Sequence, residues 1–174
     1  YAFYTRQMSQ EIEKEQRIVN SMKSALENHE FVVYYQPKYG LSDNQIAGAE
    51  ALVRWKHSER GMISPGEFIP VFERNGFITK LDYYVWEQTC IQLRRWLDEG
   101  KQPLPISVNL SRISLYNKEV VEVICDLVDK YQIPRSLFQV ELTESAYNTN
   151  PKAVQEMMQR LREEGFYILM DDFG

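Results

Sequence analysis

The sequence predicts an α/β fold built from parallel β/α units. Short apolar runs rich in β-branched and aromatic residues alternate along the chain with amphipathic segments of helical length. The helical segments also carry start signals, such as Ser64 and Pro65 followed by Glu67. Strands that alternate with helices of this length are typical of a doubly wound sheet or of a (β/α)8 barrel. The length of 174 residues suggests one domain, with or without a short appendage.

Residues 5–29 are predicted to form a long polar helix. Apolar residues between positions 5 and 29 recur at helical spacing in a narrow stripe: Met8, Ile12, Val19, Met22 and Leu26. The charge-rich remainder suits a connector or a dimerising helix better than a core element. The alternative is a solvated helix packed along the domain that follows.

Five strands and four further helices are predicted after this segment. The strands are expected at 31–37, 45–55, 105–111, 138–145 and 166–172. The helices are expected within 63–76, 79–100, 118–134 and 150–165. Gly100 and Gly165 are placed as helix stops, and Pro134 ends the helix before it.

Composition and charge exclude several classes of function. The chain is 44% hydrophobic and 26% charged, as in ordinary folded domains, and its net charge of −5 removes the electrostatic basis for binding duplex nucleic acid. No window is apolar enough for a membrane span and the N-terminus has no signal-peptide core, so we expect no membrane contact. Cys90 and Cys125 lack metal or redox spacing, which favours reduced thiols and a cytoplasmic location.

Polar side chains follow the apolar part of several predicted strands. They are Glu50, Asn109, Glu141, Asp171 and Asp172. Functional groups of parallel β/α folds collect at the carboxyl ends of strands, and a buried unpaired carboxylate is costly. Four carboxylates and one carboxamide form an all-oxygen set, which suits Mg²⁺ or Mn²⁺ and not zinc. The alternative is that these acids form ordinary salt bridges with Arg54, Arg112 or Lys38.

The two adjacent aspartates suggest more than one cation. At a strand-to-loop junction both side chains can turn towards one centre, so that Asp171 bridges two cations while Asp172 binds the second. Two cations about 3.5–4 Å apart activate a water and clamp the attacking and leaving oxygens in phosphoryl transfer.

Residues 49–55, AEALVRW, resemble the signature of EAL domains, the cyclic di-GMP phosphodiesterases. The supporting motifs follow in the family's order: YYQPKY, SPGEFIPVFERNGFI, SVNLS, ELTES and DDFG. The resemblance covers residues 31–174, the expected N-terminal part of an EAL domain. Residues 1–30 are expected to be the end of a GGDEF-like domain with its linker helix, because YAFYTRQM resembles the last strand and helix of that domain.

The resemblance implies a fold, an activity and a site. The fold is a (β/α)8 TIM-type barrel, of which this chain holds about the first five strands. The activity is metal-assisted hydrolysis of one phosphodiester bond of cyclic di-GMP, giving linear pGpG. The residues that match the family's metal ligands are Glu50, Asn109, Glu141, Asp171 and, for a second cation, Asp172. Gln36, Leu52 and Arg54 match substrate contacts, and Glu144 matches the glutamate that steadies the loop after the double aspartate.

The resemblance also implies that the site is incomplete within this chain. In the family, the chain continues beyond DDFG and supplies a lysine, a glutamate and a glutamine to the same centre. We therefore expect the 174 residues alone to be inactive. The open edge of the strand at 166–172 is expected to be covered by the rest of a longer chain or, as the second hypothesis, by another copy in a homodimer. The alternative function is a catalytically inactive EAL-type domain that senses cyclic di-GMP or docks a protein.

Overall fold

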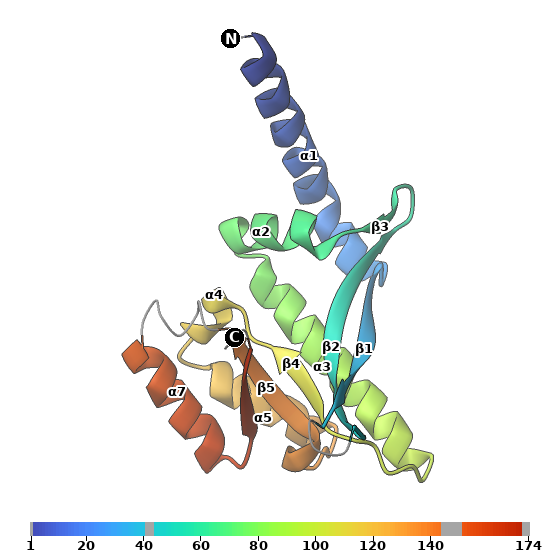
Figure 1. Ribbon diagram of the computed structural model, residues 1–174, viewed down its shortest axis with the longest axis vertical. Helices are drawn as coiled ribbons and strands as arrows, with labels where there is room; N and C mark the ends of the chain where they lie inside the picture. The colour runs from blue at the N-terminus through green and yellow to red at the C-terminus, as the bar shows by residue number, and fades with distance from the viewer. Residues whose placement is uncertain (1, 41–43, 144–150, 172–174) are drawn as a thin grey trace. The chain divides into compact units, whose positions relative to one another are not determined.

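The computed structural model describes residues 2–40, 44–143 and 151–171 (Figure 1). Its elements in chain order are α1 (Ala2–Glu27), β1 (Phe31–Tyr39), β2 (Ile46–His57), β3 (Gly61–Ile63), α2 (Pro65–Asn75), α3 (Ile78–Asp98), β4 (Ile106–Asn109), α4 (Arg112–Leu115), α5 (Val120–Lys130), the 3-10 helix η1 (Arg135–Leu137), β5 (Phe138–Thr143), α7 (Pro151–Glu163) and β6 (Tyr167–Asp171). The chain divides into two compact units: residues 1–32 with 53–78, and residues 33–52 with 79–174.

The five predicted strands and the predicted helices are all found in the described residues. Sequence reasoning missed three short elements, β3, α4 and η1, because three or four residues are too few to show a period. The helix at the start of the chain runs from Ala2, so no strand precedes it within the described residues.

The strands form one sheet in the order β1-β2-β4-β5-β6, with β3 paired to β2. Strands β2, β4, β5 and β6 are parallel, as predicted. β1 and β2 instead form an antiparallel hairpin. The amide of Lys56 donates to the carbonyl of Glu30, and the amide of Gly40 donates to that of Gln45, both at 2.8 Å. The parallel units therefore begin with β2, because no helix separates β1 from β2.

The helices of the second unit lie along one face of its parallel strands (Figure 1). Neighbouring helices are joined by ion pairs: Lys130 Nζ of α5 lies 2.8 Å from Glu87 Oε1 of α3, and Arg160 of α7 pairs with Glu122 of α5. Strands in chain order with all crossover helices on one face are wound as in a (β/α) barrel, since a doubly wound sheet carries helices on both faces. The predicted TIM-type fold class is confirmed.

The parallel register separates an apolar face from a polar face. Ala51, Val108 and Val140 are register partners on adjacent strands and are at most 3% exposed. Apolar side chains of the helices complete this core: Ile124, Leu127, Val128, Val154 and Leu161. Because side chains alternate along a strand, the next register row, through Glu50 and Ser107, lies on the opposite face.

The first unit is built around an aromatic cluster. Its members are fully buried: Phe31, Trp55, Phe68 and Phe72. The ring centroids of Phe31 and Trp55 are 5.0 Å apart, and those of Phe68 and Phe72 are 5.4 Å apart. The indole Nε1 of Trp55 donates to Glu30 Oε2 at 3.0 Å, which satisfies the buried ring's one polar atom.

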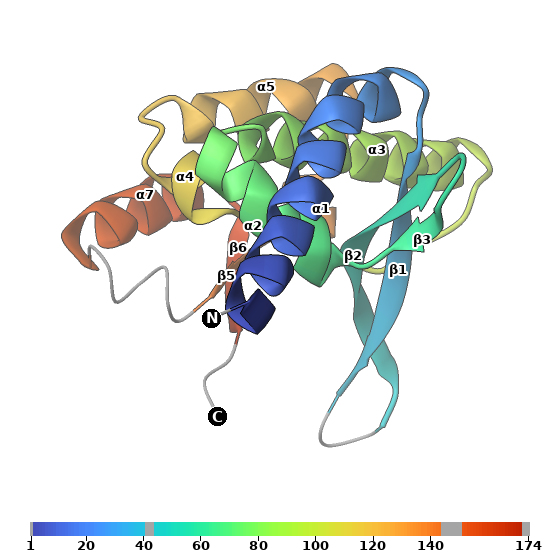
Figure 2. The ribbon, with the colours of Figure 1, turned by 90° about the horizontal axis from the view of Figure 1, so that it is seen from above.

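The C-terminal half of α1 belongs to this unit's core. Ile18, Met22 and Ala25, spaced four and three residues apart, are buried, and α1 packs against α2 (Figure 2). Met8 and Ile12, in the N-terminal half of the predicted stripe, are 51% and 64% exposed, so α1 is a core element over its C-terminal half, as in the alternative of a helix packed along the domain. No helix in the described part of the chain has the length and apolar character needed to cross a membrane.

Candidate functional site

Three of the predicted ligands meet on the polar face of the second unit's sheet. Glu50 of β2 is the register partner of Ser107, and Asn109 of β4 is the partner of Glu141 in β5. Register partners in parallel strands share a face, as do residues two apart. Asn109 Nδ2 donates to Glu50 Oε1 at 2.8 Å, so the side chains of these two residues are in direct contact.

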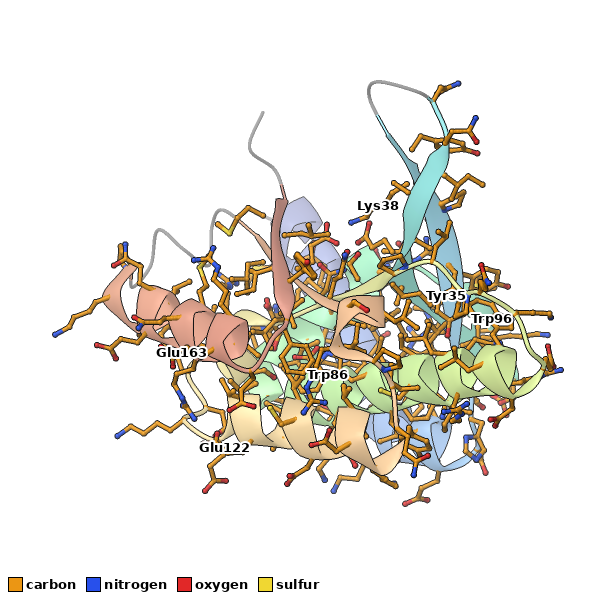
Figure 3. All side chains as sticks on the ribbon, turned by 90° about the horizontal axis from the view of Figure 1, so that it is seen from below. Tyr35, Lys38, Trp86, Trp96, Glu122 and Glu163 are labelled. Atoms are coloured by element: carbon orange, nitrogen blue, oxygen red, sulfur yellow. The ribbon has the colours of Figure 1, made fainter. Side chains whose placement is uncertain are left out.

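Glu141 is a nearly buried carboxylate held by a lysine from another strand. Its side chain is 4% exposed, and Lys38 Nζ of β1 lies 2.5 Å from Glu141 Oε2. A charge that is removed from water must be paired, and the ammonium group provides the opposite charge. Figure 3 shows Lys38 extending from β1. For Glu141, the ordinary salt bridge considered from the sequence is therefore present.

Helix α3 holds the chain segment that follows Asn109. Trp86 Nε1 donates to the carbonyl of Asn109 at 3.1 Å. One turn earlier, the buried carboxylate Asp82 Oδ2 accepts hydrogen bonds from Ser111 N at 3.2 Å and from Ser114 Oγ at 2.7 Å. Ser111 in turn caps α4 by accepting from the amide of Ser114 at 3.2 Å. These contacts fix the backbone that carries Asn109.

Asp82 and Trp86 were missed by the sequence reasoning. The sequence does contain a signal for Asp82: this carboxylate stands beside Leu81 in a segment whose apolar positions predict a buried helix face. A carboxylate in such a place needs a partner. Its partners come from residues that are 29 and 32 positions away in the sequence.

Tyr35, on the opposite face of β1, packs against helix α3. Its ring lies against Trp96, with ring centroids 5.8 Å apart and ring planes tilted by 59° (Figure 3). Burial raises the pKa of Tyr35 to about 12. Gln36, predicted to contact substrate, alternates with Tyr35, is exposed and lies on the same side of β1 as Lys38.

The other two predicted substrate residues fall in different units. Leu52 is half-buried and belongs to the second unit, two residues after Glu50. Arg54 belongs to the first unit, where its Nη1 donates to the carbonyl of Val53 at 2.9 Å.

Three predicted site residues lie partly or wholly outside the described residues. Asp171 is described as backbone only: it ends β6, opposite Thr143 of β5. Asp172 and Glu144 lie outside. Among the side chains that the structure describes, no group of three or more His, Cys, Asp or Glu residues could hold a metal ion.

The described part of the site nevertheless fits a hard divalent cation. Glu50 and Glu141 offer carboxylate oxygens, and Asn109, whose Nδ2 faces Glu50, offers its amide oxygen. Such oxygen donors suit Mg²⁺ or Mn²⁺. The cysteines play no part in this set: Cys90 is buried on α3, where burial raises the pKa of its thiol to about 12.

The winding of the sheet and the position of the acidic cluster define a β/α-barrel domain with an oxygen-rich site towards the carboxyl ends of its parallel strands. The family model of the EAL domain matches residues 19–174. The chain therefore belongs to the EAL domain family.

Relatives cover the chain over its full length. An uncharacterized signaling protein of Caulobacter vibrioides is 36% identical over 174 residues, which are 100% of this chain and 21% of the relative. The bifunctional diguanylate cyclase/cyclic di-GMP phosphodiesterase MucR of Pseudomonas aeruginosa is 31% identical over 100% of this chain and 25% of its own length. The cyclic di-GMP phosphodiesterase NbdA of the same organism is 30% identical over 99% of this chain and 22% of its own length. The chain thus spans between a fifth and a quarter of these relatives.

Solved structures agree with this assignment. The PaMucR phosphodiesterase in complex with c-di-GMP matches with a TM-score of 0.85 at 32% identity, covering 91% of this chain and 64% of that one. The FimX EAL domain of Pseudomonas aeruginosa bound to c-di-GMP matches with a TM-score of 0.81, covering 90% of this chain and 62% of that one. At 19% identity, the second match bears on the fold alone.

Proposed function

We propose that this chain is part of a cyclic di-GMP phosphodiesterase, which hydrolyses one phosphodiester bond to give linear pGpG. The observation that carries the proposal is the cluster of Glu50, Asn109 and Glu141 on three adjacent strands of an EAL domain. Two relatives at 30% identity or more, NbdA and MucR, are named as cyclic di-GMP phosphodiesterases. The PaMucR structure holds c-di-GMP.

The ligand roles follow from the chemistry of the side chains. Glu50, Asn109 and Glu141 would hold Mg²⁺ or Mn²⁺ through oxygen atoms, and Asp171 and Asp172 would complete a site for two cations. When bound, such cations withdraw charge from phosphodiester oxygens and lower the pKa of water. Asn109 orients the Glu50 carboxylate, and Trp86 fixes the backbone of Asn109.

The substrate roles are proposed from the family's motifs. Gln36 would contact the nucleotide from β1, Leu52 would line its binding site, and Arg54 would face a phosphate group, a task that suits a planar cation with several donors. Glu144 would steady the chain after the double aspartate.

A catalytically inactive EAL-type domain that binds cyclic di-GMP is the second candidate. The observation in its favour is the Lys38–Glu141 pair, since the carboxylate already has a positive partner within the protein. Binding of cyclic di-GMP without release of pGpG would identify this case.

The remaining predictions concern organisation. We propose that the residues up to about position 30 are the end of a GGDEF-like domain and its linker. The match to the bifunctional diguanylate cyclase/cyclic di-GMP phosphodiesterase MucR extends over these first residues, and the EAL family model begins within α1, at residue 19. The homodimer and the cytoplasmic location stay predictions of the sequence.

The test is chromatography of cyclic di-GMP incubated with the full-length protein and Mg²⁺ or Mn²⁺. We expect pGpG from the wild type, a loss of about a hundredfold or more for Glu50→Gln, and normal turnover for the exposed control Glu59→Gln. Failure of the wild type to bind cyclic di-GMP would overturn both candidates.

A further inference from the structure

The ion pair between Lys38 and Glu141 has a nearly buried carboxylate. The Glu141 side chain is 4% exposed, whereas the carboxylates of nine other ion pairs within the described residues are 24% exposed or more. The two partners are 103 positions apart in the sequence and come from β1 and β5. An ion pair with so buried a carboxylate is therefore not an ordinary ion pair of the solvent-exposed surface.

The ammonium group of Lys38 lies on the edge of the oxygen cluster. It is 2.5 Å from Glu141 Oε2, and Glu141 is the register partner of Asn109, which bonds to Glu50. An ammonium group and a divalent cation both bind carboxylate oxygens, and two positive charges repel each other at contact distance. Lys38 and a cation at Glu141 therefore compete for one carboxylate.

We propose that Lys38 is a built-in counter-ion of the cation site, which holds Glu141 in the cation-free protein and is displaced when a divalent cation binds. The inference rests on the ligand role of Glu141 in the proposed function. Lys38 keeps the buried carboxylate paired and in place until the cation arrives, at the expense of cation affinity.

The displaced lysine has a second place to bind. Its four-carbon stem is flexible and its side chain is 34% exposed. It shares one side of β1 with Gln36, which is also exposed. The ammonium group can therefore turn from Glu141 to a phosphate group of the substrate, so Lys38 weakens cation binding and strengthens binding of the phosphodiester.

The first measurement is a Mn²⁺ titration of the full-length protein at low ionic strength, read by the electron paramagnetic resonance of free Mn²⁺. Lys38→Met is expected to bind Mn²⁺ roughly three- to tenfold more tightly than wild type, because a competing positive charge is removed. Lys38→Arg keeps the charge and is expected to bind no more tightly than wild type. Lys130→Met is the matched control, because it also removes the lysine of an ion pair, the 2.8 Å pair of Lys130 with Glu87 between α5 and α3.

A second measurement uses linear pGpG as the probe, at saturating Mn²⁺. Lys38→Met is expected to bind pGpG roughly three- to tenfold more weakly than wild type. If Lys38 had only a structural role, Lys38→Met would disorder the site and lower the affinities for both Mn²⁺ and pGpG. A higher affinity for Mn²⁺ together with a lower affinity for pGpG distinguishes the proposal from that case.

The inference is overturned if Lys38→Met binds Mn²⁺ no more tightly than wild type, or if Glu141→Gln binds it as well as wild type does. An unchanged affinity for pGpG overturns the proposed transfer to phosphate. If wild type binds Mn²⁺ but neither cyclic di-GMP nor pGpG, the proposed function fails while the competition at Glu141 is still decided by the Mn²⁺ titration.

Discussion

At the scale of single residues, chemistry in this protein depends on the face of the strand that a side chain occupies. Glu50 and Ala51 are adjacent in sequence, yet Ala51 is 3% exposed within the core and Glu50 bonds to Asn109 on the polar face. The same alternation separates Tyr35, which packs against Trp96, from Gln36 on the side of Lys38.

The structure leaves no room for a side chain at Gly48. A Cβ at this position would lie 2.7 Å from the carbonyl oxygen of Pro105, which accepts a hydrogen bond from Ala49 N at 2.9 Å. We expect Gly48→Ala to push β2 away from the segment before β4 and to lower the free energy of unfolding by about 1–3 kcal/mol. Urea denaturation measures this. Gly66→Ala is the control, because its Cβ would meet only Ser64 Oγ, at 3.7 Å.

The pair of Glu87 and Lys130 predicts a dependence of stability on pH. The hydrogen bond from Lys130 lowers the pKa of Glu87 from 4.5, against the opposing effect of burial. A lowered pKa in the folded state stabilises the protein above pH 4.5, and this contribution is lost as the pH falls through the lowered value.

We therefore expect wild type to exceed Glu87→Gln by about 0.5–1 kcal/mol in free energy of unfolding at pH 7. The difference should disappear in acid, and urea unfolding at pH 7 and pH 3 measures it. Glu11→Gln, at an exposed position of α1, should show no such difference. An unchanged gap at both pH values would contradict the assignment.

At the scale of elements, helix α3 is the support of the site. Its residues Asp82 and Trp86, one turn apart, hold the connection from β4 to α4 through three hydrogen bonds. Asn109, the site residue that ends β4 just before this connection, is held by a helix that contributes no proposed ligand of its own.

Asp82→Asn is expected to weaken the hold on Ser111 and Ser114, because an amide is a poorer acceptor than a carboxylate. The expected result is a loss of about 1–3 kcal/mol in free energy of unfolding. A reduced affinity for Mn²⁺ should accompany it. Mn²⁺ titration together with urea denaturation separates these effects.

Asp98→Asn is the matched control for this variant. It removes an exposed carboxylate at the end of α3, where Asp98 pairs with Arg94 at 2.7 Å. We expect both its affinity for Mn²⁺ and its stability to match wild type closely. If Asp82→Asn lost stability but bound Mn²⁺ normally, α3 would support the fold and not the site.

At the scale of the whole molecule, cation binding and folding are linked. Glu50, Asn109 and Glu141 come from three strands and are brought together only in the folded chain. A cation that binds the folded state at a hundred times its dissociation constant stabilises it by about 2.7 kcal/mol. Mn²⁺ is therefore expected to raise the melting temperature of the full-length protein by several degrees, and EDTA to reverse the shift.

Glu141→Gln provides the comparison for that experiment. Calorimetry should show a smaller Mn²⁺-dependent rise for this variant than for wild type, because a charged ligand has been removed. An equal rise in both proteins would place the stabilising cation elsewhere.

The longer strands and helices of this fold could be predicted from local sequence patterns. Runs such as FVVYY and the apolar periods of α5 and α7 identify strands and helices, because burial of one face imposes a period on the sequence. The antiparallel pairing of β1 and β2 could not be predicted in this way, because a local pattern identifies a strand but not the direction of the strand beside it. The face on which the helices lie became clear only from contacts between helices, such as Lys130 with Glu87.

Residue type and order were sufficient to predict the class of fold, the family resemblance and the oxygen-bearing residues Glu50, Asn109 and Glu141. The folded structure was needed to show that Asn109 bonds to Glu50, that Lys38 pairs with Glu141, and that Asp82 and Trp86 support the connection after β4. These contacts join residues 23 to 103 positions apart. No local period encodes such pairs, because they arise from the packing of strands and helices that the chain brings together only on folding.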